Sequence, residues 1–115
     1  YTPGIIYNGL MFVSGQLSID PQTGKLPEGG VAAHAAQALK NLDVVLTEAG
    51  CRRSDVLQCR VYLPDVAYWG EFNAVYAGFF GDHKPARVVV PSRNLYGGSL
   101  VEVEAVVACD KEREA

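Results

Sequence analysis

The sequence has no long hydrophobic run and no recognisable export signal. None of its apolar stretches approaches the roughly 20 residues that a membrane-spanning helix requires, and no signal peptide is visible at its start. Both absences indicate a cytoplasmic protein. Because the chain begins at Tyr1 rather than at a methionine, we expect that an N-terminal piece has been removed or is missing from the sequence.

Cysteine and histidine are too few and too widely spaced to build a disulfide framework or a metal centre. The three cysteines, Cys51, Cys59 and Cys109, are an odd number with no close pair, which fits free thiols in a reducing cytosol. His34 and His83 are distant in sequence, and neither has the spacing to cysteine or carboxylate that metal ligands show. The sequence therefore predicts no bound metal.

Positive charge is also scarce. Ten lysines and arginines stand against 13 aspartates and glutamates, which gives a formal net charge of -3 and a pI near 5.3. The basic residues are scattered, and only Arg52 and Arg53 are adjacent. Proteins that bind nucleic acids usually concentrate Lys and Arg to neutralise phosphates, so this balance argues against a nucleic-acid partner.

The sequence does contain a regular alternation of strand and helix patterns in a chain of one-domain size. With 115 residues and 49% apolar content, residues 1–115 predict one globular domain. Short apolar runs predict strands, stripes at three- and four-residue steps predict helices, and Asn8-Gly9 favours a tight hairpin turn. The predicted elements are strands 5–7 and 10–16, helix 31–49, strand 55–63, helix 67–80 and two strands within residues 84–108.

This order, β-β-α-β-α-β-β, indicates an α+β fold in which a single sheet carries both helices on one face. The strand–helix–strand unit from residue 55 to residue 91 should cross right-handed, which makes its two strands parallel. The second helix has an aromatic stripe that indicates core packing, formed by Val66, Trp69, Phe72, Tyr76 and Phe79.

Strand 55–63 predicts that the other face of the sheet is apolar and uncovered. By two-residue alternation, its core face should hold Leu57, Cys59, Val61 and Leu63. Its opposite face should hold Val56, Gln58, Arg60 and Tyr62. The uncovered face of the whole sheet should include Val56, Tyr62, Leu100 and Val106. These side chains are too apolar for water, so we expect a partner chain to cover them.

Charged residues interrupt the two apolar runs within residues 84–108. Arg87 opens the first run, and Glu102 and Glu104 share one face of the second by the two-residue period. A guanidinium can grip a carboxylate with two parallel hydrogen bonds, which a lysine cannot reproduce. The alternatives are an arginine paired with Asp82 or a backbone carbonyl, and two solvated glutamates. We expect Arg87 and Glu102 to touch whatever molecule this protein binds or converts.

Four short segments, in order, resemble the RidA/YjgF family of enamine/imine deaminases. They are residues 12–16 (FVSGQ), 72–76 (FNAVY), 85–87 (PAR) and 101–105 (VEVEA), and the likeness extends from Tyr1 to about Ala108. The resemblance implies a chorismate-mutase-like α+β fold that assembles as a homotrimer, with the sheets forming a central barrel and three clefts between subunits.

For the site, the resemblance implies that Arg87 binds the carboxylate of the substrate. Glu102 lies 15 positions after Arg87, as the family's catalytic glutamate does after its arginine. It would orient or activate the attacking water. We interpret Glu104 as structural, and we expect Arg87 and Glu102 to meet at a subunit boundary.

Four further residues match positions around the family's substrate. Ser14 and Gly15 would form the wall of the site, where hydroxyl and backbone groups position the substrate. The sequence offers no Ser-His-Asp set that would make Ser14 a nucleophile. Tyr1 matches the family's N-terminal site tyrosine, and Asn73 matches a helix asparagine that caps or buttresses the site.

The sequence departs from the family at Val89. Many relatives carry Cys, Ser or Thr two residues after the arginine, so Val89 excludes a thiol intermediate there. Because imine hydrolysis needs no covalent enzyme intermediate, we expect Val89 to change substrate preference rather than to abolish activity. The loop between Phe80 and Pro85 also looks short, and it should border the pocket.

The predicted activity is the hydrolysis of small 2-imino or enamine carboxylic acids to ammonia and a 2-keto acid. No cofactor is needed, because an imine is already activated towards water. Two alternatives stay open. Some relatives are described as endoribonucleases, although the acidic balance and the lack of paired His or Lys count against that activity. A non-enzymatic binder of small carboxylate metabolites would use the same arginine, and Val89 keeps this alternative open.

Overall fold

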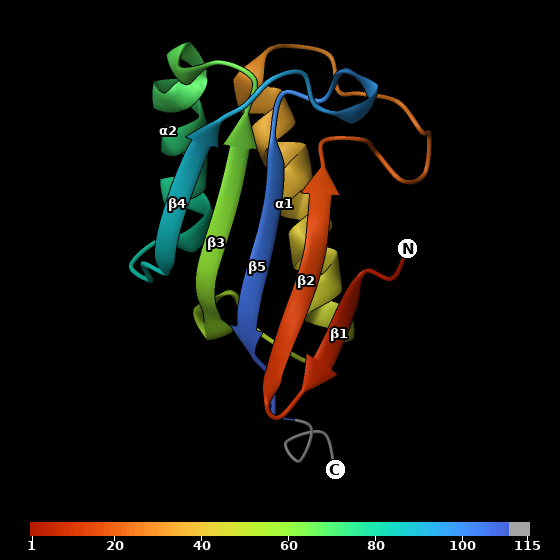
Figure 1. The fold of residues 1–115 in the computed structure, drawn as a ribbon, viewed down its shortest axis with the longest axis vertical. Coiled ribbons are helices and arrows are strands. Elements are labelled where there is room, and N and C mark those ends of the chain that lie inside the picture. Colours follow the sequence, from red (N-terminus) through yellow and green to blue (C-terminus); the bar gives the residue numbers. More distant parts are fainter. Residues whose placement is uncertain (111–115) are drawn as a thin grey trace.

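A computed structural model describes residues 1–110, so the last five residues of the predicted domain lie outside the described part. The element order is the predicted β-β-α-β-α-β-β (Figure 1). The strands are β1 (Gly4–Tyr7), β2 (Leu10–Leu17), β3 (Val56–Leu63), β4 (Ala86–Pro91) and β5 (Glu102–Ala108). The helices are α1 (Val31–Glu48) and α2 (Trp69–Phe80), with short 3-10 turns at Arg53–Asp55, Val66–Tyr68 and Tyr96–Gly98.

The five strands form one sheet in the order β1-β2-β5-β3-β4. The β3–β4 pair is parallel and the other pairs are antiparallel, because α2 carries the chain back across the sheet between β3 and β4. Both helices lie behind the same face of the sheet (Figure 1). The predicted two-layer α+β architecture is therefore confirmed. As far as residues 1–110 are concerned, neither helix has the length and apolarity needed to span a membrane.

Helix α1 supplies much of the core through a stripe that follows the helical period. The buried members of the stripe are Val31, His34, Ala35, Ala38, Leu39, Leu42 and Leu46. Helix α2 corrects the predicted aromatic stripe: Val66 is 61% exposed and Trp69 is 39% exposed. The helix begins only at Trp69, and Phe72, Tyr76 and Phe80 at four-residue steps form its buried face.

The predicted alternation of β3 is wrong at its first residues. Val56 is fully buried and Leu57 is 47% exposed, the reverse of the expected arrangement. The register with β5 shifts here, because Val56 pairs with Val107 and Gln58 pairs with the next residue, Val106. An extra residue of this kind is a β-bulge, and it reverses the alternation of side chains on either side of it.

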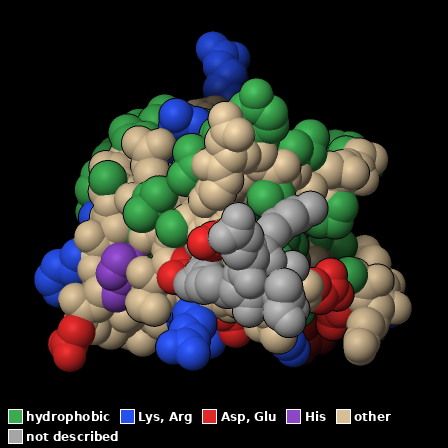
Figure 2. Space-filling model, turned by 90° about the horizontal axis from the view of Figure 1, so that it is seen from below, with side chains coloured by type: hydrophobic (Ala, Val, Ile, Leu, Met, Phe, Trp, Pro, Cys, Tyr) green, Lys and Arg blue, Asp and Glu red, His purple; other side chains and the backbone are tan. Residues whose placement is uncertain are grey.

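The face of the sheet away from the helices is mixed over the described residues, so the predicted apolar face is only partly right. Tyr62 and Val106 lie on it as predicted, but Arg60, Glu102 and Glu104 stand beside them and Val56 is buried instead. Leu100 does not belong to it: this residue precedes β5 and packs against the core. Exposed apolar side chains on this open face are Ile5, Phe12, Val88 and Val90, and Val106 is half-buried beside them. Figure 2 shows hydrophobic side chains gathered along one side of the molecule, with most acidic ones on the opposite side.

Candidate functional site

Arg87 lies on the edge strand β4 and points to the helix side of the sheet. It pairs in register with Cys59, which faces the core, and its Nη1 donates a hydrogen bond to Asn73 Oδ1 on α2 over 2.7 Å. Its Cζ lies 4.7 Å from the centroid of the Tyr76 ring and 5.9 Å from that of Trp69. Within the described residues, Nε and Nη2 make no hydrogen bond, so one edge of the guanidinium fork stays available to a ligand.

A cavity of about 300 Å³ opens beside Arg87, between α2 and the loop that leads into β4. The lining residues are Asn73, Tyr76, Ala77, Phe80, Gly81, His83, Lys84, Pro85 and Arg87. His83, Lys84 and Arg87 have basic side chains, and no acidic residue is among the lining residues. The loop between Phe80 and Pro85 therefore borders a pocket, as the sequence predicts.

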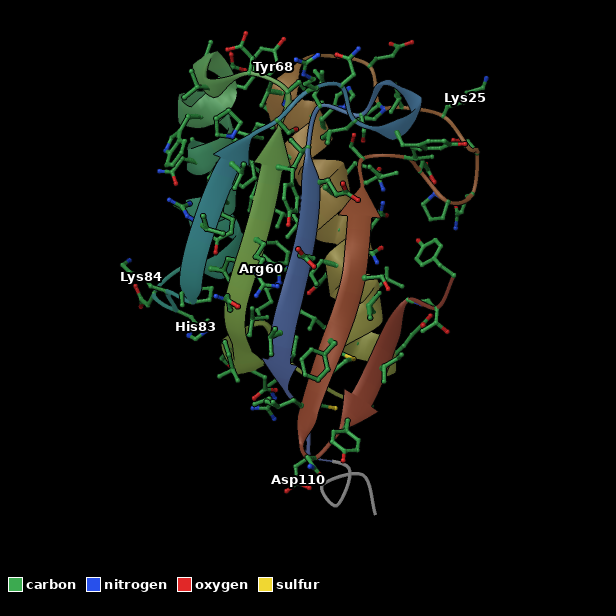
Figure 3. All side chains as sticks on the ribbon, in the orientation of Figure 1. Lys25, Arg60, Tyr68, His83, Lys84 and Asp110 are labelled. Atoms are coloured by element: carbon green, nitrogen blue, oxygen red, sulfur yellow. The ribbon has the colours of Figure 1, made fainter. Side chains whose placement is uncertain are left out.

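His83 and Lys84 lie in this loop, just before β4 (Figure 3). The His83 Nε2 is 2.7 Å from the carbonyl oxygen of Val56. Since a carbonyl can only accept, Nε2 carries the proton, and the neutral ring has its free lone pair on Nδ1. The loop is anchored in this way to the start of β3, whereas Lys84 is exposed.

Cys59 and Tyr76 lie behind Arg87 as buried neutral groups. Burial raises the pKa of the Cys59 thiol to about 11, although the Tyr76 hydroxyl and Arg87 oppose this shift. Burial, with a smaller effect of Cys59, also raises the pKa of Tyr76. The Tyr76 hydroxyl has no hydrogen bond of good geometry within residues 1–110. A thiol with so high a pKa is protonated at neutral pH, so Cys59 is a poor nucleophile.

Glu102 lies at the start of β5 with its side chain on the open face of the sheet. It is half-buried, and it pairs in register with Leu17 of β2 and Tyr62 of β3. Its carboxylate lies directly over Gly15, so closely that a Cβ at residue 15 would collide with Oε2. Burial, followed by the nearby charge of Glu104, raises the pKa of Glu102. A carboxylate of this kind is suited to accept a proton.

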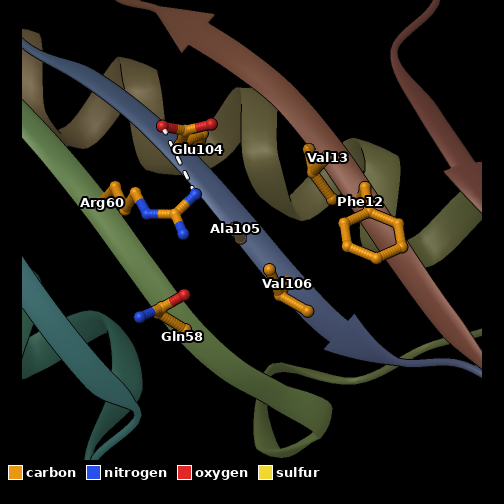
Figure 4. A pocket seen from close by; sticks show the side chains of 7 residues that line it. All are labelled: Phe12, Val13, Gln58, Arg60, Glu104, Ala105 and Val106. Atoms are coloured by element: carbon orange, nitrogen blue, oxygen red, sulfur yellow. Dashed lines mark ion pairs between the residues drawn. The ribbon is translucent and has the colours of Figure 1, made fainter.

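Glu104 is held by its neighbours on the open face. The Tyr62 hydroxyl donates a hydrogen bond to its Oε1 over 2.5 Å, and Arg60 Nη1 lies 4.0 Å from the same oxygen. Figure 4 shows Arg60 of β3 reaching Glu104 of β5, with Val106 further along β5 and Phe12 on β2. The small cavity between these side chains measures only about 50 Å³, too small for a metabolite.

Ser14 and Gly15 form a β-bulge in β2. Val13 pairs with Ala105 and Gln16 with Val103, so Ser14 and Gly15 together stand opposite one residue of β5. Such bulges are often found beside active sites, where they redirect a side chain or bring the backbone close to a ligand. Gln16 supports the bulge, because its Nε2 donates to the Ser14 carbonyl over 3.0 Å.

Ser14 also holds the N-terminal segment in place. Its hydroxyl donates to the Thr2 carbonyl over 2.6 Å, and its backbone N–H donates to the Pro3 carbonyl over 2.9 Å. A hydroxyl used in this way is not activated by a base. Tyr1, which precedes the two residues held by Ser14, is 98% exposed. It borders another cavity that is also lined by Gln16 and Tyr96.

One chain does not bring the two predicted catalytic residues together. Arg87 faces the helix layer, whereas Glu102, Ser14 and Gly15 lie on or beside the open face. Asn73 contacts Arg87 directly, and Val89 is 9% exposed, packed against the core rather than along the cavity. A substrate held by both Arg87 and Glu102 therefore requires a second chain.

Sequence reasoning missed the aromatic surroundings of Arg87. Trp69 and Tyr76 were expected only as core, because an aromatic stripe on a helix usually is core. Their spacing could have indicated a contact with Arg87: Trp69 lies four residues before Asn73 and Tyr76 three residues after it, so all three share one side of α2.

No metal-ligand cluster is found among the described residues. Within residues 1–110, no three His, Cys, Asp or Glu side chains come together as ligands would.

Known proteins share both the sequence and the fold of this chain. A family model described as Endoribonuclease L-PSP matches residues 1–109. The 2-iminobutanoate/2-iminopropanoate deaminase of Rattus norvegicus is 39% identical over 106 residues, which cover 92% of this chain and 77% of that protein. A RutC family protein of Pyrococcus horikoshii is 38% identical, with 92% and 84% covered.

Solved structures agree with this assignment. RidA from the Antarctic bacterium Psychrobacter has a TM-score of 0.89 at 30% identity, and the YjgF gene product of E. coli has a TM-score of 0.88 at 32% identity. Each alignment covers 94% of this chain and 87% of the other. The shared architecture is a five-stranded α+β sheet with two helices on one face. The chain belongs to the RidA/YjgF family, which includes proteins named as imine deaminases and others named as endoribonucleases.

Proposed function

We propose that this protein hydrolyses small 2-imino or enamine carboxylic acids to 2-keto acids and ammonia. The observation that carries the proposal is the state of Arg87. Its Nη1 is fixed by Asn73, its remaining edge opens on a cavity, and no acidic residue lines that cavity. A fixed guanidinium with a free edge is arranged to bind a carboxylate through two parallel hydrogen bonds.

In this mechanism Arg87 binds the carboxylate and thereby fixes the neighbouring C=N carbon. A water molecule held by Glu102 attacks that carbon, and the carboxylate takes a proton from the water as the C–O bond forms. The nitrogen receives this proton, which gives a carbinolamine with an OH and an NH2 group on the same carbon. The proton of that hydroxyl then passes to the nitrogen as the C–N bond breaks, so ammonia leaves and the carbon becomes the carbonyl of the 2-keto acid. Water is the only co-reactant, so atoms and charge balance without a cofactor.

A composite site follows from the opposite orientations of Arg87 and Glu102. We propose a homotrimer in which the open faces turn inward, and Arg87 of one chain meets Glu102, the Ser14–Gly15 bulge and Tyr1 of the next. Support comes from the exposed apolar side chains of that face, which a partner would cover. Light scattering at micromolar concentration should give about three chain masses. A monomer with full activity would contradict the composite site.

The direct test is turnover of 2-iminopropanoate, generated in the assay from alanine by a flavin amino acid oxidase. Semicarbazide traps the imine, so hydrolysis by the protein should slow formation of the semicarbazone in proportion to protein concentration. Equal semicarbazone formation with and without the protein would reject the deaminase. Calorimetric binding of pyruvate without turnover would support a non-enzymatic carboxylate binder instead.

An endoribonuclease is the second candidate, and one observation favours it. His83 and Lys84, which are adjacent in the sequence, line one cavity together with Arg87. Basic side chains of this kind can hold a phosphate. Cleavage of a single-stranded RNA that is lost in Arg87→Ala, together with unchanged imine levels, would select the nuclease.

A further inference from the structure

The cavity beside Arg87 is larger and more apolar than a substrate with a methyl side chain requires. Its volume of about 300 Å³ lies at the lower end of the range of ligand pockets, about 300–1,000 Å³. A water molecule accounts for about 30 Å³ of liquid volume, and a methyl group is of similar size. The carboxylate of a substrate would occupy the end of the cavity beside Arg87, and a methyl side chain would fill only a small part of the remaining volume.

The surface of that remaining space is mostly aromatic and aliphatic. Away from Arg87 and Asn73, four of the seven lining residues are apolar or aromatic (Tyr76, Ala77, Phe80 and Pro85), and the others are Gly81, His83 and Lys84. The Tyr76 and Phe80 rings lie 4.9 Å apart between centroids in a tilted arrangement, so they present a continuous ring surface. Aromatic rings of a ligand pack well on such a surface.

We propose that this cavity receives the side chain of the substrate, and that the protein acts preferentially on 2-imino acids with large apolar side chains, aromatic or branched. The inference rests on the proposed deaminase function and adds the substrate class to it.

The orientation of Arg87 supports this placement. Asn73 occupies Nη1, and the Tyr76 ring covers one face of the guanidinium at 4.7 Å. A carboxylate bound at the free edge is therefore flanked by the ring that lines the cavity. The substituent on the adjacent carbon can enter the cavity while the C=N carbon stays exposed to a water from outside it.

Charge supports an apolar substituent over a charged one. A positively charged substrate side chain would meet Arg87, Lys84 and His83 with no acidic residue among the lining. Like charges at close range disfavour binding, whereas burial of apolar groups favours it. A second carboxylate could reach only Lys84, which is exposed and surrounded by water.

Turnover of a substrate series tests the proposal. The imino acids derived from alanine, leucine and phenylalanine are generated in place by the oxidase. We expect kcat/KM to be at least tenfold higher for the phenylalanine- and leucine-derived imines than for the alanine-derived one, because a single methylene in an apolar pocket already changes this ratio about tenfold or more. Equal values, or a preference for the alanine-derived imine, would overturn the proposal.

A cavity-filling variant locates the selectivity. Ala77 is an exposed residue of α2 that lines the cavity, so Ala77→Phe should fold and fill the space. It should remove at least nine-tenths of kcat/KM for the phenylalanine-derived imine and lower kcat/KM for the alanine-derived imine by a clearly smaller factor. The matched control is Ala74→Phe, an exposed position on the same helix outside the cavity lining, which should change neither value.

Binding distinguishes failure of this inference from failure of the deaminase proposal. Phenylpyruvate and pyruvate carry the same 2-keto acid group and differ only in side chain, so calorimetry compares them without turnover. If no imine is hydrolysed, the deaminase is rejected, yet phenylpyruvate should still bind at least tenfold more tightly than pyruvate and lose this advantage in Ala77→Phe. Equal binding of the two, or no binding of either, would reject the side-chain cavity.

Discussion

The Glu102 carboxylate lies so close to the Gly15 backbone that the side chain of any other residue at position 15 would displace it. The Glu102 carboxylate lies over the Gly15 backbone at the β2 bulge, and a Cβ there would collide with Oε2. A bulge brings the backbone near this carboxylate, and the absence of a side chain at residue 15 leaves the space that the carboxylate itself occupies.

Gly15→Ala should therefore impair catalysis more than folding. The colliding atom is the far end of a flexible side chain, so Glu102 can rotate away and the free energy of unfolding should fall by less than about 1 kcal/mol. The displaced carboxylate should lower kcat at least tenfold. A double-mutant cycle with Glu102→Gln checks the cause: if Gly15 acts through Glu102, the two losses should not add. Full additivity would assign Gly15 another role.

Glu102→Gln should lower kcat by about 10²- to 10⁴-fold, the usual contribution of a positioned general base. In the wild type, activity should rise with pH through the pKa of Glu102 and level off above it, since the base must be ionised. Glu104→Gln is the matched control on the same strand. It replaces the charged acceptor of the Tyr62 bond by a neutral one, which should cost some stability while most activity remains. A Glu104→Gln enzyme as inactive as Glu102→Gln would contradict this division of roles.

Glu102 should also leave a signature in stability. Its pKa is raised in the folded state, so the folded state binds the proton more tightly than the unfolded chain does. Its contribution is most favourable below the ordinary carboxyl pKa of about 4.3 and is lost as the pH rises through the raised value. Glu102→Gln should thus melt at a higher temperature than wild type at pH 7, with the difference vanishing near pH 4. A lower melting temperature at pH 7 would argue against a destabilising charge.

Arg87→Lys should remove the forked N–H donors of the guanidinium and keep the positive charge. If the guanidinium clamps a substrate carboxylate, kcat/KM should fall at least tenfold, or about 1.4 kcal/mol of transition-state stabilisation. The melting temperature should barely change, because one exposed hydrogen bond to Asn73 contributes about 1 kcal/mol or less.

Arg53→Lys is a control with the reverse expected outcome, a change in stability without a change in activity. Arg53 binds both carboxylate oxygens of Asp43 at 3.1 Å and lies 3.9 Å above the Phe79 ring, away from the Arg87 cavity. It should lower stability slightly and leave activity unchanged. An Arg87→Lys variant that melts much earlier yet retains full turnover per folded molecule would overturn the assignment of Arg87 as the substrate clamp.

His34 should make stability fall as the pH drops below the ordinary histidine pKa of about 6.5. Its Nδ1 accepts a hydrogen bond from the Leu100 N–H over 3.0 Å and lies 2.7 Å from Ser18 Oγ, and the ring is 4% exposed. Burial lowers the pKa of His34 below its ordinary value of about 6.5. The neutral ring thus contributes stability that is present above the ordinary pKa and is lost as the pH falls through the folded value.

The melting temperature should therefore fall as the pH is lowered through the titration of His34. His34→Gln keeps an acceptor and cannot titrate, so it should be less stable at pH 7 but lose this pH dependence. An unchanged pH dependence in His34→Gln would mean that another group titrates.

The order of elements and the parallel pairing of β3 with β4 followed from the sequence, because both depend on local patterns. Apolar period, the Asn8-Gly9 turn and the handedness of a strand–helix–strand unit are properties of neighbouring residues. In the structure Asn8 and Gly9 have φ values of 52° and 76°, as the tight hairpin turn requires. The sequence also indicated that Arg87 needs a partner, since a guanidinium at the start of an apolar strand requires one, and in the structure Asn73 accepts a hydrogen bond from it.

The tertiary structure decided the rest. The bulges at Val56–Gln58 and Ser14–Gly15 arise from pairing with β5, and alternation along one strand carries no information about an extra residue in its partner. The separation of Arg87 and Glu102 onto opposite faces depends on how strands distant in sequence pair. The cavity lies within residues 73–87, and it depends on how α2 packs beside the loop before β4. Sequence specifies which chemical groups a chain contains, but only the packing of the sheet and helices fixes which of them share a space.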